Sequence, residues 1–273
     1  AITMLPGGKF YFDQGSFFGQ AIGLRLYGCD GVNRMFEFDG TYFAPISTGT
    51  TPDTPKYCVV FKDHLMCIIG SSNISSGISA PYNWTSTAGA TEKGFGDTLT
   101  GYAKLPGSGA SGTLAIGGRN NTFILYGTSA SDWNYVTYAQ DVGALHYTMQ
   151  QMTQTLFLGD RGVTTLQASQ SYGNFDQATL TNSIQPFINS HKNTVTCSGV
   201  SKERSQYRLF FSSGYGLYST IVNGKYMGST QVYFPNPATC ALSGVTSTGV
   251  EVLLFGSTNG FVYQLDKGSS FDG

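Results

Sequence analysis

The chain has 273 residues, of which only 11 % are charged and 14 % are aromatic, and its formal net charge is −1. Ordinary domains carry roughly 25 % charged residues, and proteins that recruit nucleic acid from solution carry a strong positive charge, so this composition argues against such recruitment. The absence of an 18-residue apolar run argues against membrane insertion. The length suits one domain over residues 1–273, and the character of both ends leads us to expect a part of a longer polypeptide.

One short phrase recurs along the sequence, an apolar strand-like run followed by a Gly or Ser turn. Its six copies are residues 24–28, 66–70, 114–117, 156–159, 209–212 and 253–256. Their turn residues stand 42 to 53 positions apart. A period of about 45 residues in strand-rich sequence is typical of a propeller blade. We therefore predict an all-β fold, a single β-propeller of six blades with about four antiparallel strands each.

Further strand and turn signals follow one another in chain order. Short runs rich in aromatic and β-branched residues predict strands at residues 10–12, 34–38, 122–126 and 260–265. Hairpin turns are predicted at Asp30-Gly31, Asp39-Gly40, Asn223-Gly224 and Asn259-Gly260. The one helical turn that we expect lies near residues 183–190, with Pro186 in its first turn. The terminal runs at residues 10–12 and 261–263 could share one blade and so close the circle.

A large aromatic residue follows the turn in three of the repeats, at Trp84, Trp133 and Phe175. A large ring at one place in each blade suits packing between neighbouring sheets, because it buries about 150–250 Å² of surface there. We therefore interpret these three residues as packing residues rather than as a ligand-stacking platform.

The sequence contains no recognisable catalytic or metal-binding motif. The five cysteines form no C-x-x-C pair and are read as reduced core residues, and the three histidines match no metal-site spacing. Neither His64 nor His146 has the surroundings of a catalytic base. We therefore expect no enzyme activity, no catalytic residues, no metal site and no cofactor.

Three arginines fall at similar places in successive repeats, Arg119, Arg161 and Arg208. One reading is a cluster at the propeller axis that contacts an anion. The other reading is a set of solvated arginines, or of arginines that bridge blades. Both readings stay open at this point.

Several strings resemble tail proteins of short-tailed double-stranded DNA bacteriophages. They are residues 36–41 (FEFDGT), 45–49 (PISTG), 53–55 (DTP), 62–65 (KDHL), 70–84, 89–97 (GATEKGFGD), 125–133 (LYGTSASDW), 255–266 and 271–273. The likeness covers most of residues 24–273.

This resemblance implies a virion protein of the tail hub or nozzle type, also described as DNA-stabilisation or tail tubular proteins. Such proteins form a hexameric ring below the portal and adaptor, and they help to retain the genome and to conduct it during ejection. The implied partners are other copies of the chain, the adaptor and other tail proteins, and genomic double-stranded DNA in transient, non-specific contact. The implied location is the virion tail, after synthesis in the host cytoplasm.

In such a ring, exposed tyrosines would supply contact area at a low entropic cost. We name Tyr82, Tyr172 and Tyr215 as candidate interface residues. The alternative function is a carbohydrate-binding or carbohydrate-cleaving propeller used in host recognition. That alternative predicts exposed aromatic residues around a pocket and, for an enzyme, two carboxyl groups about 5–9.5 Å apart.

Overall fold

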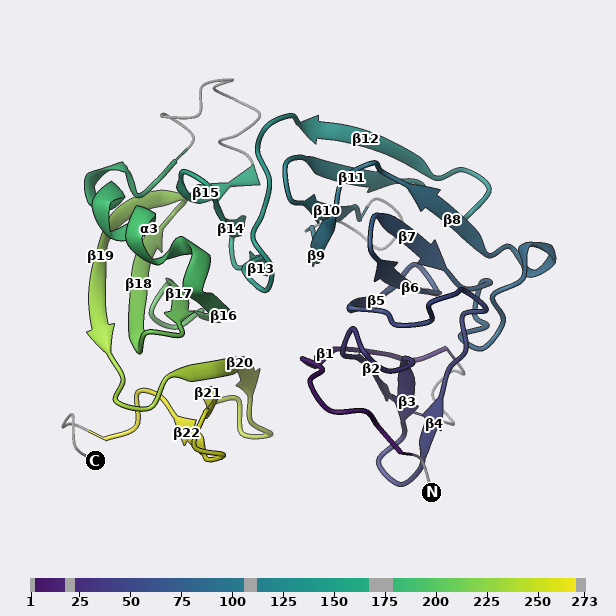
Figure 1. The fold of residues 1–273 in the computed structure, drawn as a ribbon, viewed down its shortest axis with the longest axis horizontal. Helices are drawn as coiled ribbons and strands as arrows, with labels where there is room; N and C mark the ends of the chain where they lie inside the picture. The colour runs from purple at the N-terminus through teal and green to yellow at the C-terminus, as the bar shows by residue number, and fades with distance from the viewer. Residues whose placement is uncertain (1–2, 18–22, 106–111, 167–178, 269–273) are drawn as a thin grey trace. The chain divides into compact units, whose positions relative to one another are not determined.

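The computed structural model describes residues 3–17, 23–105, 112–166 and 179–268. Within these ranges the chain forms six small antiparallel sheets, which follow one another in sequence, and one short α-helix. The fold is an all-β, six-bladed β-propeller, as the sequence repeat predicts. The chain divides into two compact units, Ala1–Gln140 and Asp141–Gly273, with three sheets each (Figure 1).

The first unit contains three four-stranded sheets, in each of which strands adjacent in sequence are paired. Their strands are β1 (Tyr11–Gly15), β2 (Arg25–Cys29), β3 (Phe36–Phe38) and β4 (Phe43–Pro45); β5 (Tyr57–Phe61), β6 (His64–Ile69), β7 (Ser72–Ser75) and β8 (Thr91–Gly94); β9 (Leu99–Lys104), β10 (Leu114–Gly118), β11 (Thr122–Tyr126) and β12 (Asn134–Ala139). One 3₁₀ turn, η1 (Ser86–Ala88), lies between β7 and β8.

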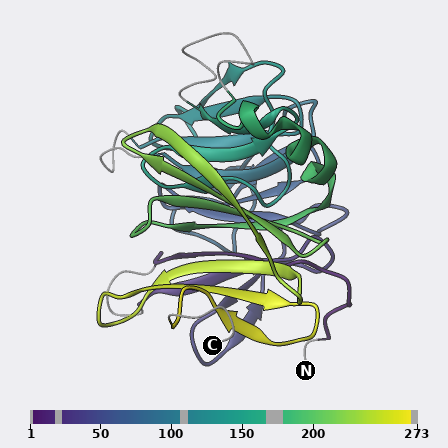
Figure 2. The same cartoon turned by 90° about the vertical axis from the view of Figure 1, so that its left-hand side faces the viewer.

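The second unit contains a four-stranded sheet and two sheets with three described strands. The strands are β13 (Gln150–Gln151), β14 (Thr155–Gly159) and β15 (Gly162–Thr165); β16 (Val195–Ser201), β17 (Gln206–Phe211), β18 (Tyr215–Val222) and β19 (Lys225–Tyr233); β20 (Ala238–Val245), β21 (Glu251–Ser257) and β22 (Val262–Gln264). Figure 2 shows the long, twisted hairpin of β18 and β19 from the side.

The predicted helix is present as α3 (Gln185–His191), between the 3₁₀ turns η2 (Asn182–Ile184) and η3 (Lys192–Thr194). Pro186 lies in its first turn, where the missing N–H of proline leaves no intrahelical hydrogen bond unmade. Ile188 is the buried residue of the helix and joins the core of the second unit.

The recurring phrase marks the same strand of every blade. Its six copies fall on β2, β6, β10, β14, β17 and β21, and each of these is the second strand of its sheet. This strand has a hydrogen-bonded partner on both sides. Nearly all of its side chains are buried in β6, β10, β14 and β17, whereas β2 is buried over its last three residues and β21 at alternate positions. That position explains why an apolar run is the most regular feature of the sequence.

The core of the first unit joins side chains of its first two sheets. Tyr27 and Cys29 of β2 pack with Cys58, Leu65 and Cys67 of β5 and β6. Trp84 packs against this cluster, as expected of an inter-blade aromatic residue. Trp133 is half-buried, and its ring lies 4.7 Å from the His64 ring. Phe175 lies outside the described residues.

The terminal strand runs do not share a sheet in the described part of the chain. β1 pairs with β2, whereas β22 pairs with β21. The expectation that residues 10–12 and 261–263 share one blade is therefore wrong for these residues. Each run instead pairs with the strand nearest to it in sequence, which needs only a short connection.

All five cysteines are free, and four of them are buried as expected for core thiols. Cys240 is the exception, because its place on β20 leaves it exposed. Burial raises the pKa of the Cys67 thiol well above its usual value. In the part of the chain that is described, no helix is long and apolar enough to cross a membrane.

Candidate functional site

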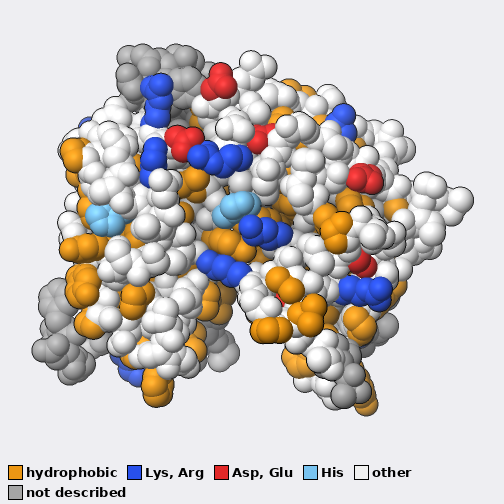
Figure 3. All heavy atoms as spheres, in the orientation of Figure 1, with side chains coloured by type: hydrophobic (Ala, Val, Ile, Leu, Met, Phe, Trp, Pro, Cys, Tyr) orange, Lys and Arg blue, Asp and Glu red, His pale blue; other side chains and the backbone are white. Residues whose placement is uncertain are grey.

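An open pocket of about 210 Å³ lies on the first sheet. Its lining combines charged, polar and apolar side chains: Gln14, Leu24, Arg25, Leu26, Phe38, Asp39 and Gly40. These residues come from β1, from β2 and the residue before it, and from the end of β3 and the turn after it. In Figure 3, hydrophobic side chains gather over this part of the first unit, below and to the right of the centre. The pocket is therefore a candidate binding site on one blade.

Arg25 is the central charged residue of this pocket. Its Nη1 lies 2.9 Å from Asp39 Oδ2, and its Nε lies 3.6 Å from Glu37 Oε1. The side chains of Arg25 and Glu37 are only 14 % and 9 % exposed, whereas that of Asp39 is 25 % exposed. Two carboxylates thus share one guanidinium, and exposure increases from Glu37 towards Asp39.

Glu37 is in turn held from the core side by Tyr27. The two residues face each other in the β2–β3 register, and the Tyr27 hydroxyl donates a 2.8 Å hydrogen bond to Glu37 Oε2. Tyr27 is fully buried, and burial followed by this hydrogen bond raises its pKa. Tyr82 also faces this carboxylate, and burial together with the charge of Glu37 raises the pKa of Tyr82 to about 12. Both phenols are protonated at neutral pH, as tyrosines normally are, and can donate to Glu37.

Asp39 has a second role as the cap of the β3–β4 hairpin. Its Oδ1 accepts hydrogen bonds from the backbone N–H groups of Thr41 and Tyr42, at 2.8 and 2.6 Å. A carboxylate that binds two backbone donors fixes the turn and its own orientation together. A continuous chain of polar contacts therefore runs from Tyr27 in the core through Glu37, Arg25 and Asp39 to the hairpin.

This arrangement suits binding better than catalysis. Glu37 is nine-tenths buried and Tyr27 wholly buried, so neither reaches a molecule in the pocket. Asp39 and Arg25 are the charged groups that line it. They can donate to and accept from a ligand, but their charges are already paired with each other.

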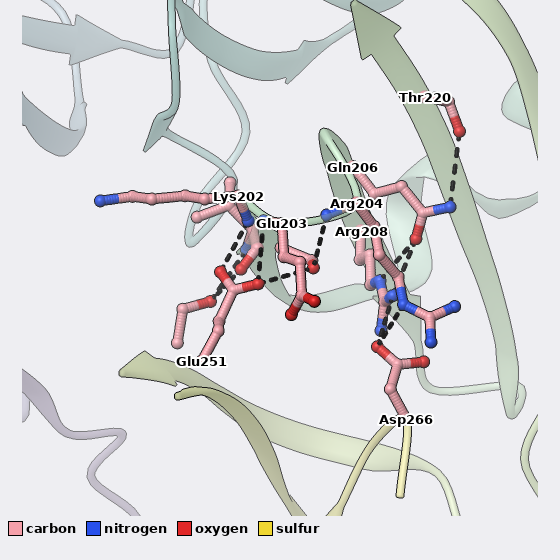
Figure 4. A network of polar contacts seen from close by, with 11 residues as sticks. Lys202, Glu203, Arg204, Gln206, Arg208, Thr220, Glu251 and Asp266 are labelled. Atoms are coloured by element: carbon pink, nitrogen blue, oxygen red, sulfur yellow. Dashed lines mark hydrogen bonds and ion pairs between the residues drawn. The ribbon is translucent and has the colours of Figure 1, made fainter. Parts of the chain in front are cut away.

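A second polar network joins two sheets of the second unit (Figure 4). Arg208 on β17 is fully buried, and its Nη2 lies 2.6 Å from Asp266 Oδ2, just after β22. The side-chain amide oxygen Oε1 of Gln206 accepts hydrogen bonds from Arg208 Nε and Nη2 at 3.1 and 2.7 Å. The guanidinium also stacks 4.2 Å from the centre of the Tyr218 ring. Arg208 therefore bridges blades through Asp266.

Glu251 forms the other half of this network. It accepts hydrogen bonds from the backbone N–H groups of Lys202 and Glu203, at 2.6 and 3.1 Å, and from Ser201 Oγ at 2.9 Å. Burial opposes ionisation of Glu251, but these hydrogen bonds outweigh it and lower the pKa of the carboxyl. Glu251 thus holds the β16–β17 turn from the first residue of β21.

The three arginines predicted from the repeats occupy different environments. Arg119 follows β10 and is half-buried, and its backbone N–H bonds to the Thr98 carbonyl oxygen. Arg161 lies exposed in the β14–β15 connection. Arg208 lies within a strand, and the anion that it contacts is Asp266 of the same chain. For Arg208 the blade-bridging alternative is therefore the correct one, because burial and pairing remove its guanidinium from external anions.

The predicted interface tyrosines also differ from one another. Tyr82 is 47 % exposed, beside Glu37. Tyr215 is half-buried, and its ring lies 5.1 Å from that of His191 and 5.4 Å from that of Tyr233. Much of the surface of the Tyr215 side chain is therefore buried by packing within the chain. Tyr172 lies outside the described residues.

Sequence reasoning missed Arg25, Glu37 and Asp39 as a group. Two signals could have found them. Arg25 and Tyr27 alternate along one strand, so they lie on one face, and Glu37 and Asp39 alternate in the same way along the next strand. The predicted Asp39-Gly40 turn also identifies Asp39 as a capping residue. The register of β2 against β3, which brings these residues together, could not be predicted from the sequence.

No family model matches the chain, and no curated protein matches it. Among solved structures, BBS1N in complex with ARL6DN is similar at 13 % identity, both in a mercury-soaked crystal (TM-score 0.60, 94 % of this chain and 77 % of that chain) and in a lead-soaked one (0.61, 93 % and 76 %). Chaetomium thermophilum Raptor is similar at 12 % identity, with a TM-score of 0.54 over 82 % of this chain and 21 % of that chain. At these identities the likeness shows the fold alone.

Proposed function

We propose that this chain is a structural protein of a phage virion, a hub or nozzle component of a short tail. In this role it forms a homo-hexameric ring below the portal and adaptor, and helps to retain the genome and to conduct it during ejection. It is made in the host cytoplasm and works in the virion tail, without enzyme activity and without membrane insertion. Its partners are other copies of itself, the adaptor and other tail proteins.

One observation carries this proposal: the strings that resemble tail proteins contain the aspartates that fix the loops. Asp53 accepts hydrogen bonds from the backbone N–H and the hydroxyl of Thr48, at 3.1 and 2.6 Å. Asp132 accepts from the backbone N–H groups of Thr128 and Ser129, at 2.9 and 2.7 Å. Asp39 caps its hairpin in the same way.

Two further aspartates in those strings connect separate segments. Asp97 accepts hydrogen bonds from the backbone N–H groups of Asn120 and Asn121, at 2.8 and 3.0 Å, and so ties the β8–β9 loop to the β10–β11 turn. Asp266 holds Arg208 of the neighbouring sheet. The resemblance therefore concerns residues that set loop geometry, as expected when loops must present fixed surfaces to neighbouring proteins.

A protein with a similar fold is known to take part in a protein complex. BBS1N, which has a similar fold, was crystallised in complex with ARL6DN, so such a fold serves there in a protein complex. A ring of copies would require obligate interfaces of about 2,000 Å² or more per contact. Exposed apolar residues that suit such contacts are present in the last sheet, including Leu242, Val245 and Val262.

The charge of the chain suits passage of DNA. Each phosphate that a protein neutralises adds affinity and slows movement. With 15 Lys and Arg against 16 Asp and Glu, the chain has no excess of positive charge for tight DNA binding. Transient, non-specific contact with double-stranded DNA is therefore what we propose.

Immuno-electron microscopy tests the proposal directly. Antibodies raised against the purified chain should label the tail end of intact virions, and unrelated antibodies from the same serum source should not. Label on the capsid, or absence of the chain from purified virions, would contradict the tail role. Hydrolysis of a host polysaccharide by the purified chain would contradict the non-enzymatic part of the proposal.

A further inference from the structure

We propose that Cys58 and Cys67 form a disulfide bond between β5 and β6 when the folded chain meets an oxidant. This inference does not rest on the tail role, because it follows from the strand register of one sheet. It gives a role to a group of three buried thiols in the core of the first unit, those of Cys29, Cys58 and Cys67.

The register places Cys58 and Cys67 directly opposite each other. They are Cα partners in the antiparallel pairing of β5 with β6. Residues related in this way are nearest cross-strand neighbours and project from the same face of the sheet. Both side chains accordingly belong to the same core cluster.

The backbone hydrogen bonds show what kind of pair this is. Leu65, two residues before Cys67 on β6, donates its N–H to Ser76 Oγ at 3.0 Å, and its carbonyl oxygen accepts from the Ser76 N–H at 2.8 Å. Both backbone groups of Leu65 therefore point away from β5. Orientation alternates along an antiparallel ladder, so Cys67 points the same way, and it forms a non-hydrogen-bonded pair with Cys58.

Such a pair has the spacing that a disulfide needs. The Cα atoms of a non-hydrogen-bonded pair lie about 4.5 Å apart. Disulfides usually join Cα atoms about 4.4–6.8 Å apart. The bond can therefore close through rotation of the two side chains, with little movement of the strands.

Cys29 is the competing partner. Its Sγ and that of Cys58 donate to the same acceptor, the Tyr11 carbonyl oxygen, at 3.9 and 3.8 Å. Cys29 belongs to β2 of another sheet, however, and no strand register relates it to Cys58. Cys67 is the partner whose backbone geometry fits, and the test must separate it from Cys29.

Burial limits the rate of the reaction. The three side chains are completely or almost completely buried, and burial raises the pKa of the Cys29 and Cys67 thiols. The thiolate is the reactive form, so oxidation in the closed structure is slow. Within its sheet β5 is paired only with β6, so local opening of this edge strand gives an oxidant access to Cys58.

The oxidant that we specify is a small disulfide, with oxidised glutathione as the probe. One cysteine thiolate attacks it, forms a mixed disulfide and releases one glutathione thiolate. The second cysteine thiolate attacks the cysteine sulfur of the mixed disulfide and releases the other. The two cysteines thus lose two electrons and two protons, which the two glutathione molecules gain.

The product is a covalent tie across the β5–β6 hairpin. A chain made in a reducing compartment keeps both thiols, whereas the same chain in an oxidising environment becomes cross-linked. The pair therefore acts as a modification site that responds to the redox compartment.

Peptide mapping of the whole 273-residue chain tests the proposal, in a C240S background that removes the exposed thiol. Trypsin cleaves after Lys and Arg, so the three cysteines fall in separate peptides, residues 26–34, 57–62 and 63–93. The folded chain is incubated with oxidised glutathione, quenched with acid, alkylated and digested.

The expected product is a link between peptides 57–62 and 63–93 that dithiothreitol removes. Full alkylation of Cys58 and Cys67 would overturn the proposal. A link between peptides 26–34 and 57–62 in its place would overturn the assignment of Cys67 as the partner.

Two variants and an internal control sharpen the result. C29A removes the competing thiol and should leave the yield of the link unchanged, whereas C67A should abolish every link to peptide 57–62. Cys197 is buried in the second unit and faces Phe210 in its strand register, so it should stay fully alkylated. Links to Cys197 in equal yield would show scrambling of unfolded chains and overturn the proposal. Circular dichroism checks that both variants fold, and the map of the C240S chain decides the matter if either does not.

Discussion

Two arginines of this propeller are held by acidic residues in opposite ways. Arg25 on the first sheet is shared by two carboxylates and lines an open pocket, whereas Arg208 in the second unit is completely buried and paired with Asp266. The Gln206 side chain and the Tyr218 ring also contact the Arg208 guanidinium. The Arg–Asp pair on the first sheet therefore lies at a surface pocket, whereas the Arg–Asp pair in the second unit bridges two blades.

The difference lies in what surrounds the guanidinium. A buried cation without its partner is strongly destabilising, whereas a partly exposed one is compensated by water. Arg208 thus depends on Asp266 for folding stability, and Arg25 depends on its carboxylates mainly for orientation. Variants of the two networks should separate these roles.

The largest effect is expected from D266N. It leaves the buried Arg208 guanidinium without a counter-charge, so the free energy of unfolding should fall by about 3 kcal/mol. Urea unfolding of the purified protein measures this. The control is D160N, because Asp160 is 53 % exposed and lies 4.0 Å from Lys192. An equal loss in both variants would show that the Arg208 bridge has no special role.

A smaller effect is expected from Y27F in the first network. The variant removes the hydroxyl that donates to Glu37 and should lower the free energy of unfolding by about 1.5 kcal/mol, because a hydrogen bond to a buried charged group is lost. Y126F is the matched control, since Tyr126 is 41 % exposed. If Y27F unfolds at the same urea concentration as Y126F, Tyr27 does not support the pocket.

The Glu251 network should make the second unit sensitive to acid. The folded pKa of Glu251 is lowered from 4.5, so its contribution to stability is present above that pH and is lost as the pH falls through the folded value. The stability difference between the unaltered protein and E251Q should therefore shrink as the pH falls below about 4.5. Urea unfolding at pH 7, 5 and 3 measures this, and a difference that stays constant over this range would contradict the role of Glu251.

The smallest effect is expected from Q14A, the pocket variant of the first sheet. Gln14 is exposed, so its loss should change the free energy of unfolding by no more than about 0.5 kcal/mol. The same urea series measures it. A loss as large as that of Y27F would mean that Gln14 supports the blade and is not free to serve a ligand.

The sequence was sufficient for the fold because the second strand of every blade carries an apolar run. The repeat was predicted from the apolar runs of β2, β6, β10, β14, β17 and β21, and nearly every residue of β6, β10, β14 and β17 is buried. Helix α3 was predictable from its proline. The pairing of the two terminal runs was predicted wrongly, because strand sequences do not specify their partner when both neighbours are apolar.

The polar networks were harder to predict for a physical reason. Asp266 and Arg208 are 58 positions apart and meet only when two sheets pack together. Arg25 and Glu37 meet through the register of one hairpin, which a single residue of slippage would abolish. Capping aspartates such as Asp39 act within a few residues, and so they are visible in sequence as turn signals.

The most direct test of the central claim is an electron cryomicroscopy map of the intact virion that contains this chain. The tail role predicts density at the tail axis that fits six-bladed propellers, arranged as a ring of six copies below the portal and adaptor. A map that resolves the tail and contains no propeller there would contradict it.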